Sequence, residues 1–125
     1  MQCVSTKGAP SAIGPYSQAV VHGGIVYCSG QISLIPETGE LLVGDVEAQT
    51  EQVLRNLAAV LEAADSSLDR AIKCTVYVKS MDDFARVNEV YAKHVSPDNP
   101  PARACVEVAR LPKDVLVEID CIAAQ

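Results

Sequence analysis

The sequence predicts an α+β fold, a two-layer sandwich in which two helices cover one face of a mixed β-sheet. Three observations support this. The chain has 125 residues, a length that suits one compact domain spanning 1–125. Hydrophobic residues make up 49% of the chain, enough for a core. Apolar residues alternate in several short runs and recur at helical spacing in two longer ones, without the strict strand–helix alternation of a parallel sheet.

Three strands are expected in the first part of the chain. "QCVST" (2–6) has the length of a short edge strand, and the Pro- and Gly-punctuated segment 9–17 predicts an ordered loop. Two apolar runs flank Gly23 and Gly24, a pair that favours the tight turn of a β-hairpin. "IPETGE" (35–40) predicts a further turn.

Two amphipathic helices are expected. In residues 46–64 the apolar side chains fall on one face, Asp45 is a suitable N-cap, and Glu47 and Glu51 suit the helix dipole. The second helix is expected over 82–95. Its inward residues are Phe84, Val87, Val90 and Tyr91.

The remaining strands give the order β-β-β-α-β-α-β-β. Residues 71–80 alternate, with one set of apolar side chains on the core side, and 100–122 predicts two strands joined by the polar turn "LPKD". The strands keep apolar residues on both faces, so the uncovered sheet face is expected to meet another copy of the chain. The core-side set is Ile72, Cys74, Val76 and Val78.

Charged residues lie where the last two strands should be buried. An even loop centred between Pro112 and Lys113 would pair the strands so that the polar residues share one sheet face. Like-charged carboxylates would then be direct neighbours, and a carboxylate with a raised pKa suits proton transfer. The polar set is Arg103, Cys105, Glu107, Glu118 and Asp120.

Arg103 carries a planar cationic fork that matches a small carboxylate. In the predicted register Arg103 and Glu118 lie roughly 13 Å apart along the ladder. They can share a site only if both side chains reach inward, if water bridges them, or if a second subunit completes the pocket. In the simpler interpretation Arg103 and Glu118 form a structural ion pair, Cys105 is inert, and His22 and His94 are not catalytic.

Composition excludes several classes of protein. The net charge of −6 and the scattered basic residues argue against nucleic-acid and anionic-membrane binding. Five cysteines without a CxxC pair argue against a disulfide framework or a zinc site, and no metal ligand set is expected. The sequence has no run long enough to span a membrane and no signal-peptide pattern, so the cytoplasm is expected.

Three separated motifs resemble the RidA family, also called the YjgF/YER057c/UK114 family. They are "AIGPYSQAV" (12–20), "YCSGQI" (27–32) and "PPARACVEVARLPKDVLVEI" (100–119). The resemblance implies a chorismate-mutase-like fold assembled as a homotrimer, with sites between subunits. It also implies cofactor-free hydrolysis of reactive 2-imino acids or enamines to 2-oxo acids and ammonia, which protects pyridoxal-phosphate enzymes.

The same resemblance implies roles for individual residues. Arg103 would grip the substrate carboxylate, Glu118 would position or activate water, and Tyr16 would hydrogen-bond the substrate or shuttle a proton. Cys105 would contribute its main-chain N–H. The other pocket residues would be Ser29, Gly30 and Asn88.

Three other functions remain open at the level of sequence. A non-catalytic trimer that binds a small carboxylate would need Arg103 but not Glu118. A ribonuclease or translation-inhibitor role is disfavoured by the acidic charge. A redox-controlled chaperone would depend on the five thiols and not on Arg103.

Overall fold

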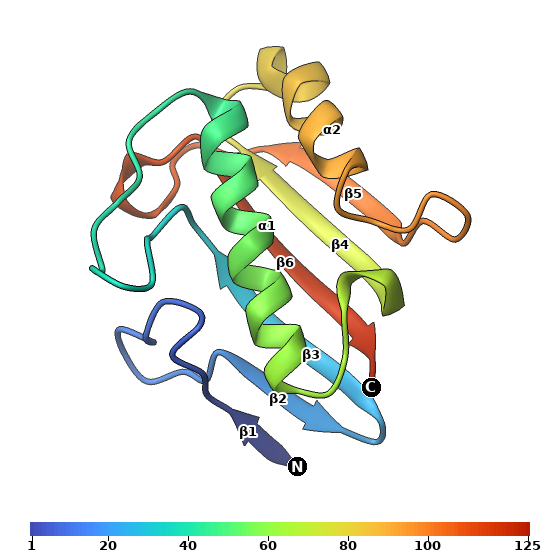
Figure 1. The fold of residues 1–125 in the computed structure, drawn as a ribbon. Coiled ribbons are helices and arrows are strands. Elements are labelled where there is room, and N and C mark those ends of the chain that lie inside the picture. The colour runs from blue at the N-terminus through green and yellow to red at the C-terminus, as the bar shows by residue number, and fades with distance from the viewer.

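The computed structural model describes residues 1–125 as one six-stranded mixed sheet with two helices on one face (Figure 1). The order along the sheet is β1-β2-β3-β6-β4-β5. The strands are β1 (Gln2–Val4), β2 (Ala19–His22), β3 (Ile25–Gln31), β4 (Ala71–Val78), β5 (Ala102–Glu107) and β6 (Val117–Ala124), and the helices are α1 (Val46–Ala63) and α2 (Phe84–Ala92). The predicted mixed sheet and its helical layer are confirmed.

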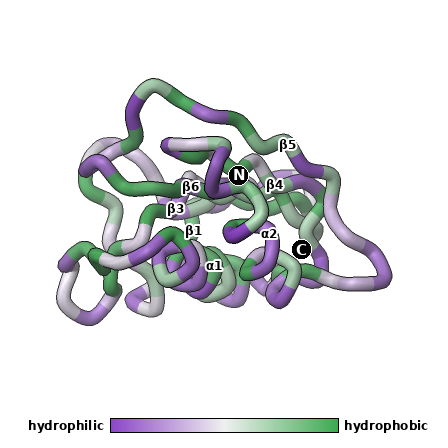
Figure 2. The backbone as a smooth tube through the Cα atoms, turned by 90° about the horizontal axis from the view of Figure 1, so that it is seen from above, coloured by the Kyte–Doolittle hydropathy of each residue, from purple (hydrophilic) through white to green (hydrophobic).

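The main core lies between the sheet and the helices. Side chains of α1 such as Leu54, Leu57 and Leu61 are fully buried against Val26 and Ile119 of the sheet. Figure 2 shows both helices on one side of the strands and leaves the other side of the sheet uncovered. Neither helix has the length and apolar content that a membrane crossing requires.

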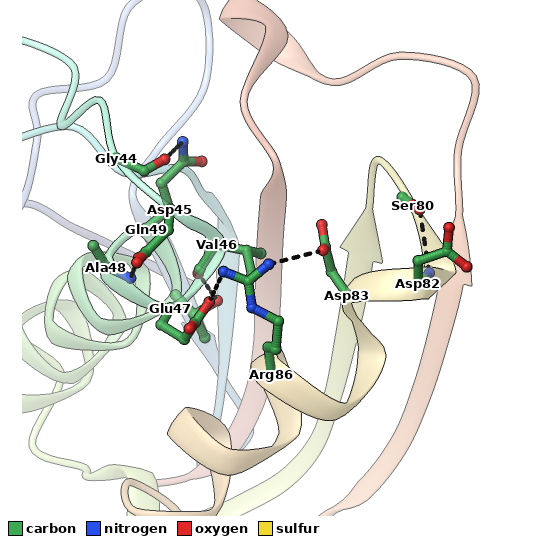
Figure 3. Close-up of polar contacts among 11 residues, drawn as sticks. Gly44, Asp45, Val46, Glu47, Ala48, Gln49, Ser80, Asp82, Asp83 and Arg86 are labelled. Atoms are coloured by element: carbon green, nitrogen blue, oxygen red, sulfur yellow. Dashed lines mark hydrogen bonds and ion pairs between the residues drawn. The ribbon is translucent and has the colours of Figure 1, made fainter.

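A capping contact starts α1, and an ion pair joins α1 to α2 (Figure 3). The Asp45 carboxylate accepts from the Ala48 N–H at 2.8 Å, which confirms the predicted N-cap. Arg86 of α2 pairs with Glu47 of α1 at 2.6 Å and approaches Asp83 at 3.6 Å, which links the two helices. The helix predicted over 82–95 is shorter at both ends: a 3₁₀ turn (Met81–Asp83) precedes it, and it ends at Ala92.

One predicted core residue of β4 is exposed. Cys74, Val76 and Val78 are buried as expected, but Ile72 is 45% exposed. The pairing of β4 with β6 shifts register between Ala71 and Lys73, and such an irregularity breaks the alternation of faces.

β5 and β6 do not form the hairpin that the sequence predicted. β4 lies between them and pairs with β5 in parallel and with β6 in antiparallel orientation. The linker 108–116 passes the end of β4, where Val108 N–H donates to Val78 and Lys79 N–H donates to Leu116.

This topology corrects the predicted polar face. Arg103, Cys105 and Glu107 pair with buried β4 residues and therefore lie on the helix side of the sheet. Glu118 and Asp120 pair with Tyr77 and Thr75, and they lie on the open side. The physical reason is burial: the core-facing positions of β6 are fully buried apolar residues, which suits a central strand, whereas β5 is mostly exposed and forms an edge.

Candidate functional site

A cleft of about 580 Å³ lies beside Glu118 on the open side of the sheet. It gathers four of the predicted site residues, which come from the loop before β2, from β3 and from β6. They are Tyr16, Ser29, Gly30 and Glu118. Pro10, Gln18, Ile32, Leu34, Pro112 and Lys113 are among the other lining residues.

An irregularity in β3 shapes the floor of this cleft. The register of β3 against β6 shifts between Cys28 and Gln31, so Ser29 and Gly30 lie outside regular pairing. The Ser29 hydroxyl donates to the Ser17 carbonyl at 2.6 Å and its N–H donates to the Gln18 carbonyl, which fixes the segment.

Gly30 allows the Glu118 carboxylate to lie directly against the β3 backbone. A Cβ atom at position 30 would be only 3.0 Å from Glu118 Oε1 and 3.1 Å from its Cδ. The absence of a side chain at position 30 therefore leaves room for the carboxylate beside the β3 backbone.

The environment of Glu118 favours its protonated form more than water does. Burial raises the pKa of Glu118 above its usual range, and the negative charge of Asp120 raises it further. The sequence predicted a like-charged neighbour in Glu107, but β4 separates that residue from Glu118. A half-buried carboxylate with a raised pKa is suited to proton transfer.

The loop that carries Tyr16 is held by the buried amide of Gln18. Its Oε1 accepts from the Thr6 N–H at 2.6 Å, and its Nε2 donates to the Pro10 carbonyl at 2.7 Å and to that of Thr6 at 3.1 Å. The Tyr16 hydroxyl accepts from the Ile13 N–H at 3.3 Å, and its ring remains half exposed at the cleft.

The opposite wall comes from the β5–β6 linker, which the sequence treated only as a turn. Lys113 has φ 55° and Asp114 has φ 56°, both in the left-handed region. Arg110 clamps this turn through bidentate contacts to Asp114 at 2.8 and 3.2 Å. The backbone of "LPKD" brings Lys113 to the cleft. Sequence reasoning missed this wall, although the cluster of turn residues could have indicated it.

Arg103 lies on the other side of the sheet, against α2. Its guanidinium carbon is 5.4 Å from the ring centre of Phe84 and 5.0 Å from that of Tyr91. Nη1 donates to Asn88 Oδ1, and a shallow pocket of about 520 Å³ contains Arg103, Asn88 and Tyr91. The structural ion pair between Arg103 and Glu118 does not form, since no carboxylate lies within ion-pair distance of Arg103.

Cys105 lies two residues further along β5 and contacts the main core. Burial raises the pKa of its thiol, although the Arg103 charge opposes the shift, so the neutral thiol predominates. Cys28, Cys74 and Cys121 are buried, as predicted for small core residues.

The histidines lie apart from the Glu118 cleft and from the Arg103 pocket. His22 is exposed at the end of β2, and His94 contacts Glu51 of α1.

Thus one chain holds two separate groups of predicted site residues. Tyr16, Ser29, Gly30 and Glu118 line the open-side cleft, whereas Arg103 and Asn88 meet beside α2. The first group offers a proton acceptor and exposed backbone, and the second offers a cation shaped for a carboxylate.

Known proteins resemble this chain over nearly its whole length. Residues 6–125 match the family model described as Endoribonuclease L-PSP. A RutC family protein of Pyrococcus horikoshii is 53% identical, covering 98% of this chain and 96% of the relative. The 2-iminobutanoate/2-iminopropanoate deaminase of Escherichia coli is 48% identical, covering 98% of this chain and 96% of the relative.

Solved structures extend the likeness to the backbone. RidA from an Antarctic Psychrobacter species superposes with a TM-score of 0.95 at 46% identity, with 100% of each chain covered. TdcF of Escherichia coli with bound serine gives a TM-score of 0.92 at 44% identity, covering 100% of this chain and 99% of that one. The fold, the ordered motifs and the near-complete sequence matches together establish that this chain belongs to the YjgF/RidA family.

Proposed function

We propose that this protein hydrolyses reactive 2-imino acids, in particular 2-iminopropanoate and 2-iminobutanoate, to 2-oxo acids and ammonia. The observation that carries the proposal is the free guanidinium of Arg103, which has a neutral partner in Asn88 and no carboxylate of the chain beside it. A cation kept in this way on a protein of net charge −6 is available to a carboxylate ligand. The E. coli relative, a 2-iminobutanoate/2-iminopropanoate deaminase, supports the same chemistry.

A complete site requires a second copy of the chain, because Arg103 and Glu118 lie on opposite sides of one sheet. We infer a homotrimer in which the Glu118 cleft of one protomer receives Arg103 and the Cys105 main-chain N–H of its neighbour. The open sheet face supports this, since Tyr27 and Val106 are 47% and 43% exposed there.

In the proposed mechanism, Arg103 binds the substrate carboxylate through two parallel N–H···O bonds. Glu118 accepts a proton from water while the water oxygen bonds to the imine carbon. Glu118 passes this proton to the nitrogen, and the remaining proton of the former water follows it, so that the C–N bond breaks and ammonia leaves as the C=O bond forms. Tyr16 hydrogen-bonds the substrate. The imine is already electrophilic, so orientation and a placed base suffice, and the proposal includes no cofactor.

The test is a coupled assay in which a threonine dehydratase generates 2-iminobutanoate in the presence of a chemical trap. Release of 2-oxobutanoate is measured with and without this protein. Acceleration supports the deaminase, and its absence with a correctly folded protein contradicts it. The proposed setting is the cytoplasm, where removal of such imines would protect pyridoxal-phosphate enzymes.

A non-catalytic carboxylate-binding protein is the main rival. It would use Arg103 in the same way, but it gives no reason for a half-buried carboxylate of raised pKa in a cleft. The family model is described as an endoribonuclease, but a nuclease would need a basic surface for nucleic acid, and this chain has a net charge of −6.

A Gly30→Ala variant is expected to lose activity about 10- to 100-fold while the fold persists. The new Cβ would meet the Glu118 carboxylate at 3.0 Å, and this flexible side chain would move out of position. The measurement is kcat/KM in the coupled assay together with thermal unfolding. In the background of Glu118→Gln the same change should have little further effect, and an equal loss in both backgrounds would contradict the explanation.

An Asp120→Asn variant is expected to move the acid limb of the kcat/KM profile to lower pH. The negative charge of Asp120 raises the pKa of Glu118, so its removal lets Glu118 ionise at lower pH. Burial still holds that pKa above its usual range, and Asn retains the oxygen that accepts from the Tyr77 hydroxyl. A limb that stays in place, or moves to higher pH, would show that Glu118 is not the titrating base.

A further inference from the structure

We infer that Phe84 and Tyr91, with Asn88 between them, form an aromatic cradle on α2 that holds the Arg103 guanidinium in the orientation that receives the substrate carboxylate. This inference rests on the proposed function and assigns two positioning residues to it. Sequence periodicity treated both aromatic residues only as core.

The cradle follows from helix geometry. Residues 84, 88 and 91 are spaced i, i+4 and i+7, so they form one stripe along α2. Positions seven residues apart are separated by about 10 Å along the axis. The guanidinium carbon lies 5.4 Å from one ring centre and 5.0 Å from the other, as expected for a group held between the two rings.

The faces and one edge of the guanidinium are thereby occupied. The rings of Phe84 and Tyr91 attract the cation through their π faces, and Asn88 accepts from Nη1. Nε and Nη2 donate to no group of the chain, so that edge remains for a bidentate carboxylate.

Such a cradle has a purpose at this position. β5 is an edge strand with an exposed Arg103, and a free arginine samples many rotamers that binding would have to restrict. Neutral partners restrict the side chain in advance without neutralising its charge. A carboxylate in place of Asn88 would compete with the substrate for the same fork.

The test uses Phe84→Leu and Tyr91→Leu, which keep apolar bulk and remove one ring each. Each variant is expected to raise the Kd for 2-oxobutanoate about 3- to 10-fold, and to raise KM for the imine more than it lowers kcat. The conservative Tyr91→Phe keeps the ring and is expected to restore wild-type affinity.

The matched control is Val90→Ala, a buried core residue of the same helix that lies outside the stripe of residues 84, 88 and 91. It should lower the melting temperature without changing the Kd. If Phe84 and Tyr91 are merely structural, the two leucine variants will behave in the same way, and the inference is overturned.

A spectroscopic readout separates the cradle from the proposed activity. In the ligand-free protein the Arg103 side-chain NMR resonances should be shifted by the ring currents of Phe84 and Tyr91, and each leucine variant should reduce that shift. A wild-type protein that shows the shift and binds 2-oxobutanoate but hydrolyses no imine would overturn the deaminase and leave the cradle supported. Resonances at ordinary positions, unchanged in the variants, would overturn the cradle whatever the activity.

Discussion

Replacement of Arg103 by alanine is expected to lower kcat/KM for imine hydrolysis about 100-fold or more. The proposed carboxylate contact consists of two charge-assisted hydrogen bonds, each contributing about 1.5–3 kcal/mol. Arg103 is exposed on the edge strand β5, so its loss should leave the fold intact. The coupled dehydratase assay measures the rate, and light scattering checks that the variant has the assembly of the wild type.

Two further variants isolate the cause of that loss. Arg103→Lys keeps the charge but not the planar fork, and it should also be a poor enzyme with a raised KM. Arg55→Ala removes one cation from an exposed position of α1 and should leave the rate unchanged. An Arg103→Ala protein that is correctly assembled and hydrolyses the imine at the wild-type rate would end the proposal.

Local sequence patterns predicted much of the fold. The period of the apolar residues in 46–64, the cap at Asp45 and the Gly23-Gly24 turn depend only on nearby residues, and the structure confirms all three. The alternation in β4 was correct except at Ile72, where the pairing partner changes register. Short-range chemistry determines these features.

The pairing of the last strands could not be obtained in the same way. A polar turn between two apolar runs favours a hairpin, yet which strands become neighbours is decided by the burial of the whole sheet. The sequence did hold a signal: β6 alternates strictly, with Val117, Ile119 and Cys121 buried, whereas β5 carries Arg103 and Glu107 near its ends. The core-facing positions of β6 are apolar, as in a central strand, whereas β5 carries charges at such positions, as an edge strand can.

The candidate residues came from motifs, whereas their arrangement required the structure. Arg103 and Glu118 were expected on one face and lie on two, and this is why we propose a site that two chains complete. Tyr91 was expected in the core and is buried there, and Phe84 is partly buried. Their contact with Arg103 could not be predicted, because a helix stripe that fills a core has the same spacing as one that holds a guanidinium.

A Glu118→Gln variant is expected to bind 2-oxobutanoate with nearly wild-type affinity and to lose about 10²- to 10⁴-fold in kcat, the range for removal of a general base. The amide preserves the shape of the side chain beside Gly30 but cannot accept the proton from water. Calorimetry gives the affinity, and the coupled assay gives the rate. If binding is lost together with the rate, Glu118 shapes the site and is not the base.

Mixed assemblies of the two inactive variants test whether each site spans two subunits. Arg103→Ala and Glu118→Gln chains are unfolded together and refolded. In some of the resulting sites, the intact Glu118 of one chain then lies beside the intact Arg103 of its neighbour. With equal, random mixing about a quarter of the sites are restored, because each of the two subunits at a site must be of the right kind. If both residues acted within one chain, every site would lack one of them and mixing would restore nothing. Recovery of activity would therefore establish that Arg103 and Glu118 meet across an interface, as we propose from their positions on opposite sides of one sheet.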